Sequence, residues 1–229
     1  MQPWLTRRGR RRYKIAYIRW LLSPQGTQPV PYLRSFAPRR HTALRIWAAE
    51  LLSGHLAVPR KIGRIYLPSP PCAKLCAIRW HARHYKPKYF IETGTFLGDT
   101  TAAVADLFEE CLTVELSAEL YGKACARFAD AATIRCLHGD SGELIAKIVP
   151  DLSAPALFWL DAHASGGLTT HASYDPLLTE LEAILAQRET GHVILIDDAR
   201  GHPIERIRRM VPSGRSFAVR NDIIRILPA

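Results

Sequence analysis

Residues 89–115 read YFIETGTFLGDTTAAVADLFEECLTVE, and this stretch decides the fold. It begins with an apolar run that ends in Glu92, passes through a turn containing Gly94 and Gly98, and continues into a helical pattern. A second apolar run, residues 112–115, closes the stretch. A strand, a glycine turn, a helix and a second strand in this order are typical of a parallel sheet with helical connections.

The same alternation continues toward the C-terminus. We predict strands at residues 89–92, 112–115, 133–137, 156–161 and 192–197, and helices at 100–109, 118–128, 141–148, 176–187 and 204–210. The end, SFAVRNDIIRILP, predicts an antiparallel hairpin around Asn221 and Asp222. The fold class is therefore α/β: a doubly wound, mostly parallel Rossmann-like sheet with a C-terminal antiparallel hairpin.

The charge of the chain is unevenly distributed. The 229 residues carry a net charge of +10, yet residues 1–90 hold 19 of the 31 Lys and Arg and only Glu50 among the acids. We predict a basic, partly helical N-terminal extension over residues 1–68, with a helix at 41–56, and one domain over 69–229 that opens with a helix ending near His84. An apolar content of 48% excludes a disordered chain.

The basic extension has several candidate partners. It is either a solvated tail or a surface for anionic membrane lipid or acidic glycan, with nucleic acid as the weaker candidate. We expect no transmembrane segment, because the chain has no run of about 18 apolar residues. Five cysteines without a C-x-x-C pair predict free thiols and hence a cytoplasmic protein. The alternative location is peripheral contact with the inner face of the membrane.

The expected strand ends carry most of the acids that point to chemistry. Glu92 with Gly94 and Gly98 forms E-x-G-x-x-x-G, which suits an ammonium or sulfonium group better than a pyrophosphate, although an ordinary strand-to-helix turn is the alternative. Glu115 could accept hydrogen bonds from both hydroxyls of a ribose or could cap a helix. Asp140 and Ser141 could face an adenine ring or cap the next helix.

The last two parallel strands end in Asp161 and in the pair Asp197 and Asp198. Three clustered carboxylates repel one another, so Mg²⁺ would stabilise them, while the alternative is that Arg200 or another basic residue neutralises them. His163 has the ordinary pKa of a general base, or is a loop histidine bonded to the backbone. The loop over residues 165–174 is either a mobile flap for an acceptor or an ordered surface loop.

Over residues 85–229 these motifs resemble class I S-adenosylmethionine-dependent methyltransferases, and within them the macrocin-type sugar O-methyltransferases. The resemblance implies that Glu92, Gly94, Thr95 and Gly98 hold the methionine part of the cofactor and that Glu115 binds its ribose. It implies that Asp140 and Ser141 lie near adenine. It also implies that Asp161, Asp197 and Asp198 bind Mg²⁺ and that a side chain of this group serves as the base.

The chain departs from that family at two positions. Phe96 stands where a glycine is common, and His163 stands where the macrocin-type group has a second aspartate. The function expected is methyl transfer from S-adenosylmethionine to a hydroxyl of a sugar or glycan-type small molecule, Mg²⁺-assisted, with Asp161 and His163 as catalytic residues. The alternatives are an RNA methyltransferase, an NAD(P)-dependent oxidoreductase on the same architecture and a non-enzymatic basic binding module.

Overall fold

The structure of the protein is a computed structural model of residues 1–229. The structure describes residues 61–62, 65–66, 71–162, 176–187 and 191–228. The chain divides into two compact units, Met1–Ala37 and Pro38–Ala229. The first unit lies wholly outside the described residues, as does the predicted helix at 41–56, so the boundary between residues 68 and 69 stays a prediction.

The described part of the second unit is built on a seven-stranded sheet in the order β5-β4-β3-β6-β7-β9-β8. Its strands are β3 (Tyr89–Thr93), β4 (Glu110–Glu115), β5 (Ile134–His138), β6 (Ala156–Leu160), β7 (Val193–Ile196), β8 (Arg215–Arg220) and β9 (Ile223–Pro228). The pairs among β3 to β7 are parallel, and β9 pairs antiparallel with β7 and with β8. A separate two-stranded sheet joins β1 (Lys61–Ile62) and β2 (Ile65–Tyr66).

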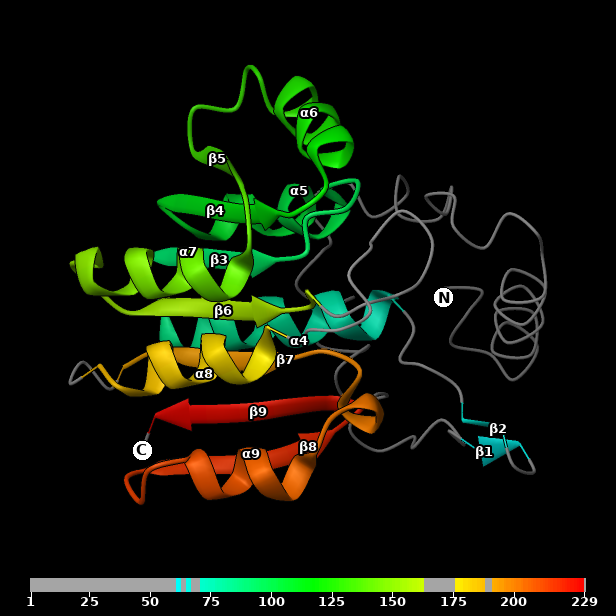
Figure 1. The fold of residues 1–229 in the computed structure, drawn as a ribbon, viewed down its shortest axis with the longest axis vertical. Helices are drawn as coiled ribbons and strands as arrows, with labels where there is room; N and C mark the ends of the chain where they lie inside the picture. The colour runs from blue at the N-terminus through cyan, green and yellow to red at the C-terminus, as the bar shows by residue number, and fades with distance from the viewer. Residues whose placement is uncertain (1–60, 63–64, 67–70, 163–175, 188–190, 229) are drawn as a thin grey trace, which may run out of the picture. The chain divides into compact units, whose positions relative to one another are not determined.

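Helices cover both faces of the large sheet (Figure 1). They are α4 (Pro71–Tyr85), α5 (Asp99–Val104), α6 (Ala118–Arg127), α7 (Ser141–Ile148), α8 (Leu177–Leu185) and α9 (Ile204–Met210). One apolar core joins α7, α8 and α9 to the side chains of Ile91, Phe158 and Ile194. The other joins α4 and α5 to Phe90, Leu157 and Trp159, which alternate with the first set along the strands.

The C-terminal hairpin turns through Asn221 and Asp222, with φ of 53° and 59°. Two consecutive residues in the left-handed region define a type I′ turn, which matches the twist of the flanking strands, and Asn and Asp tolerate it better than most residues. Arg220 pairs with Ile223 at the ends of β8 and β9. The predicted hairpin is confirmed at this position.

The predicted fold class is also confirmed, and the elements lie within a few residues of the expected bounds. One helix differs: residues 100–109 do not form a single α-helix, since α5 ends at Val104 and a short 3₁₀ turn, Ala105–Leu107, leads to β4. Phe108 is buried after this turn, so the chain must leave the helix early to place that ring in the core. Among the described residues, no helix has the length and apolarity required to cross a membrane.

Candidate active site

The strand order reverses between β3 and β6, because β4 and β5 extend the sheet on one side and β7 and β9 on the other. In doubly wound sheets ligands bind beyond the carboxyl ends of the strands at this reversal. The ends of the neighbouring strands are bonded together here: Asp161 N–H donates to the Thr93 carbonyl at 3.1 Å, and Asp197 N–H donates to the Leu160 carbonyl at 3.0 Å. The predicted acids Asp161 and Asp197 therefore lie together at the carboxyl ends of neighbouring strands.

The loop after β3 requires its two glycines. Gly94 has φ of 84°, and a Cβ there would lie 2.6 Å from the carbonyl oxygen of Asp161. Gly98 has φ of 74°, and its Cβ would lie 2.7 Å from two carbons of the Phe128 ring, which follows α6. A side chain at either position would combine backbone strain with a collision. The glycines thus let the loop lie against β6 on one side and Phe128 on the other.

Phe96 is held in a conformation that favours glycine. Its φ is 49° and its side chain is 43% exposed. Its backbone N–H donates to Glu115 Oε2 at 2.8 Å, while Ser117 N–H donates to Glu115 Oε1 at 2.9 Å. Glu115 therefore fastens the loop after β3 to the loop after β4. Ser117, and not Glu115, is the side-chain cap of α6, since its hydroxyl accepts from Leu120 N–H at 3.4 Å.

Glu92 is buried below this loop. Its Oε2 accepts from the hydroxyls of Thr101 at 2.6 Å and Thr113 at 2.8 Å. The Thr113 hydroxyl in turn accepts from Thr95, 2.6 Å away, because its own proton is directed to Glu92. Burial raises the pKa of Glu92 to about 7, although the threonine hydroxyls oppose the shift. Glu92 thus positions the loop through Thr95 and Thr113.

Asp140 caps α7, with one carboxylate oxygen accepting from Glu143 N–H at 3.1 Å. Ser141 is the first residue of that helix and is buried. The capping alternative raised by the sequence is therefore present in the structure. The cap uses one oxygen of Asp140, so it leaves the other for a ligand.

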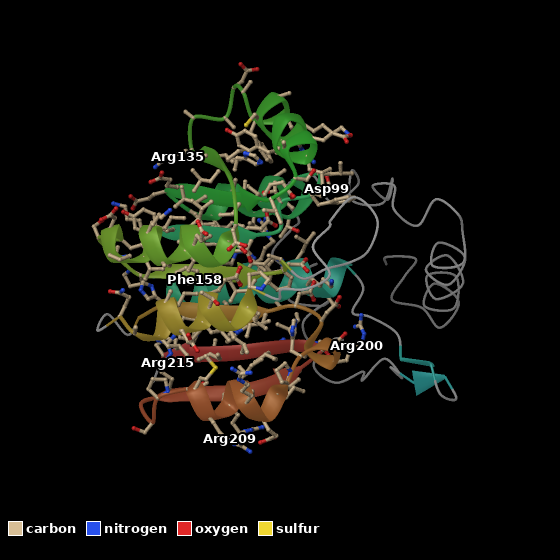
Figure 2. The ribbon with its side chains drawn as sticks, in the orientation of Figure 1. Asp99, Arg135, Phe158, Arg200, Arg209 and Arg215 are labelled. Atoms are coloured by element: carbon tan, nitrogen blue, oxygen red, sulfur yellow. The ribbon has the colours of Figure 1, made fainter. Side chains whose placement is uncertain are left out.

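Two of the three aspartates expected to hold Mg²⁺, Asp197 and Asp198, pair with protein cations. Lys74 Nζ, from α4, donates to Asp197 Oδ2 and lies 3.8 Å from Asp198 Oδ1. Arg200 Nη1 lies 3.2 Å from Asp198 Oδ1 and also pairs with Asp222. Figure 2 shows Arg200 and Asp99 at the same end of the sheet, whereas Arg135 and Arg215 lie at the opposite end.

Lys74 is a cation under all ordinary conditions. Burial lowers the pKa of its ammonium, but the charges of Asp197, Asp161 and Asp198 together outweigh burial, so that the pKa is raised above the usual value. Among the described residues no group of three or more His, Cys, Asp or Glu side chains is arranged for a metal ion. An ammonium bonded to the buried Asp197 does not fit a divalent ion on the same carboxylates.

Sequence reasoning named the neutralising alternative but not Lys74. The signal available was weak: a single lysine near the start of a helix that precedes the sheet. His163 and the loop over 165–174 lie outside the described residues, so the predicted base and flap stay predictions.

The chain was compared with known proteins. No family model matches it, and no curated protein sequence does. Solved structures do match, and the class they define is that of S-adenosylmethionine-dependent O-methyltransferases. The fold of this chain is therefore the Rossmann-like methyltransferase fold.

Three solved structures illustrate the likeness. A protein from Staphylococcus aureus assigned as a caffeoyl-CoA O-methyltransferase is 14% identical, with 82% of this chain and 95% of that one covered and a TM-score of 0.52. The O-methyltransferase TomG of Streptomyces achromogenes, solved with S-adenosylmethionine, is 15% identical, with 86% and 95% covered and a TM-score of 0.52. An O-methyltransferase of Bacillus cereus, solved with S-adenosylhomocysteine, is 14% identical, with 83% and 92% covered and a TM-score of 0.50.

Proposed function

We propose that this protein transfers a methyl group from S-adenosylmethionine to a hydroxyl oxygen. The observation that carries the proposal is the loop 93–98, held open by Gly94 and Gly98 at the reversal of strand order and fastened to Glu115. On this fold that position binds an adenosyl cofactor, and the acids around it favour a cationic one.

The roles proposed for the cofactor follow from the placement of each group. Gly94, Thr95 and Gly98 shape the surface against the methionine part, with Glu92 beneath it. Each carboxylate oxygen of Glu115 accepts one backbone N–H and has a further lone pair. These lone pairs accept hydrogen bonds from the ribose hydroxyls. Asp140 and Ser141 lie at the start of α7, after β5, and we assign them to the adenine ring.

The acceptor we propose is a sugar or another hydroxylated small molecule. A lone pair of its oxygen forms the new carbon–oxygen bond as the bond between methyl and sulfur breaks, which leaves neutral S-adenosylhomocysteine. The hydroxyl proton passes to a base, for which His163 is the candidate. Alignment of sulfur, methyl and oxygen supplies most of the acceleration, on the order of 7–11 kcal/mol in ideal intramolecular reactions.

The basic residues ahead of the domain complete the proposal. Residues 1–68 carry 14 Lys and Arg against the single acid Glu50, which favours an acidic acceptor or an anionic surface, such as the inner face of a membrane, as the place of action. RNA is the rival acceptor with the same charge requirement.

Transfer of label tests the reaction and its acceptor together. The protein is incubated with S-adenosylmethionine labelled in the methyl group and with either neutral sugars, acidic sugars or RNA. We expect labelled sugar and S-adenosylhomocysteine in equal amounts. Label on RNA alone would overturn the sugar acceptor, and labelled product formed at the same rate by Asp161→Ala would overturn this site as the place of transfer.

A further inference from the structure

Lys74 belongs to α4, which packs on one face of the sheet against β6 and β7, and its ammonium reaches the carboxyl end of β7. Lys74 lies in the first turns of α4, whose side chains Ala77, Ile78 and Ala82 pack against the face of the sheet that carries Leu157, Trp159 and Leu195. That packing fixes the direction in which the lysine extends. Its Nζ ends against Asp197, the residue that follows β7.

The partner of Lys74 is the most buried carboxylate of the group. The side chain of Asp197 is 0% exposed, and its other oxygen, Oδ1, accepts from Asp198 N–H at 2.8 Å. A carboxylate removed from water in this way is stable only when it is paired and hydrogen-bonded. Lys74 and the Asp198 amide supply both requirements without any added ion.

The ammonium also retains capacity for a ligand. It has three N–H donors, and the separation of 3.8 Å from Asp198 Oδ1 is too long for a hydrogen bond. The side chain of Lys74 is 23% exposed, so it is not sealed below the surface of the edge. A positive donor therefore lies beside Asp197 and Asp198, at the carboxyl ends of the strands that also carry the proposed cofactor site.

We propose that Lys74 takes the place of a divalent metal at this site: it holds Asp197 and Asp198 together and donates a hydrogen bond to the acceptor oxygen, so that methyl transfer needs no metal ion. The hydrogen bond to the acceptor rests on the proposed function. The replacement of the metal rests only on the ion pairs of Lys74. Lys74 contacts the acceptor oxygen in this proposal and keeps its own proton throughout the reaction.

Manganese binding tests the replacement directly. Mn²⁺ alone is titrated into the full chain, and free Mn²⁺ is followed by electron paramagnetic resonance. Wild type should leave Mn²⁺ free. Lys74→Met should gain one Mn²⁺ per chain, because its carboxylates lose their cation, and Lys74→Met with Asp197→Asn should lose that site again. Lys88→Met is the matched control, since Lys88 pairs at the surface with Glu109, 3.1 Å away.

Either of two results would overturn the proposal: stoichiometric Mn²⁺ binding by wild type that Asp197→Asn abolishes, or a folded Lys74→Met protein that gains no site. If Lys74→Met does not fold, Lys74→Arg decides, because it keeps the charge and should neither bind Mn²⁺ nor need it for transfer. Calorimetry with S-adenosylhomocysteine separates the two proposals. If the cofactor product does not bind, the proposed function is wrong, but the Mn²⁺ titration still tests whether Lys74 replaces a metal.

Discussion

At the scale of single residues, the buried Glu92 links stability to pH. Burial raises its pKa to about 7 in the folded chain, against an ordinary value of 4.5. Between these two values the folded protein keeps a proton that the unfolded chain has lost. The contribution of Glu92 to the free energy of unfolding therefore falls as the pH rises from 4.5 to 7, by up to about 3 kcal/mol.

The variant Glu92→Gln removes this dependence. Urea unfolding of both proteins is measured over pH 4 to 8. As the pH rises from 4.5 to 7, the free energy of unfolding of wild type should fall relative to that of the variant. Glu182→Gln on the exposed side of α8 is the control and should follow wild type. A constant difference between wild type and Glu92→Gln would show that folding does not shift the pKa of this carboxyl.

His81 opposes Glu92 over much of the same range. Its Nδ1–H donates to the Ala77 carbonyl at 2.7 Å, and burial lowers its pKa to about 4. Stability from this residue is present above pH 6.5 and is lost as the pH falls toward 4. The two slopes have opposite signs and partly cancel in wild type, so the comparison of variants is the informative measurement.

Gly98 and Gly122 form a matched pair of glycines. Gly98→Ala meets the Phe128 ring and a φ of 74°, so we expect a loss of about 2–4 kcal/mol. Gly122 lies within α6, where an added Cβ has no neighbour within 4 Å, so Gly122→Ala should gain about 0.5–1 kcal/mol. Thermal unfolding measures both. Equal effects of the two changes would contradict the close approach of Phe128 to the loop.

At the scale of elements, α7 has its cap and its proposed ligand on one residue. Asp140→Ala removes the hydrogen bond to Glu143 N–H and should cost about 1 kcal/mol. Asp140→Asn preserves the cap, so its melting temperature should match wild type, while its affinity for S-adenosylhomocysteine should fall if the carboxylate faces the adenosine. Wild-type affinity in the Asn variant would leave Asp140 as a cap alone.

The elements themselves were largely predictable from the sequence, and the reason is their pattern. Each parallel strand is a short apolar run, and the glycine turn after Glu92 and the Asn221-Asp222 turn each require a backbone that few residues adopt. Lys74 could not be assigned in this way. It is 123 residues from Asp197 in the chain, and only the docking of α4 across the sheet joins them.

At the scale of the whole molecule, stability should depend on the cofactor. A ligand that binds only the folded chain adds about 2.7 kcal/mol to the free energy of unfolding when its concentration is about 100 times its Kd. For a domain of this size the melting temperature should rise by about 5–10 °C with S-adenosylhomocysteine. The Gly98→Ala variant should gain less than Gly122→Ala does, because only the first change disturbs the loop.

Calorimetric titration of the full chain with S-adenosylhomocysteine, with NADH in a parallel titration, tests the central claim most directly. The account predicts one S-adenosylhomocysteine per chain and no heat from NADH. It further predicts weaker binding by Glu115→Ala, which loses the proposed ribose acceptor. Binding of NADH without S-adenosylhomocysteine would contradict the assignment and point to an oxidoreductase on the same sheet.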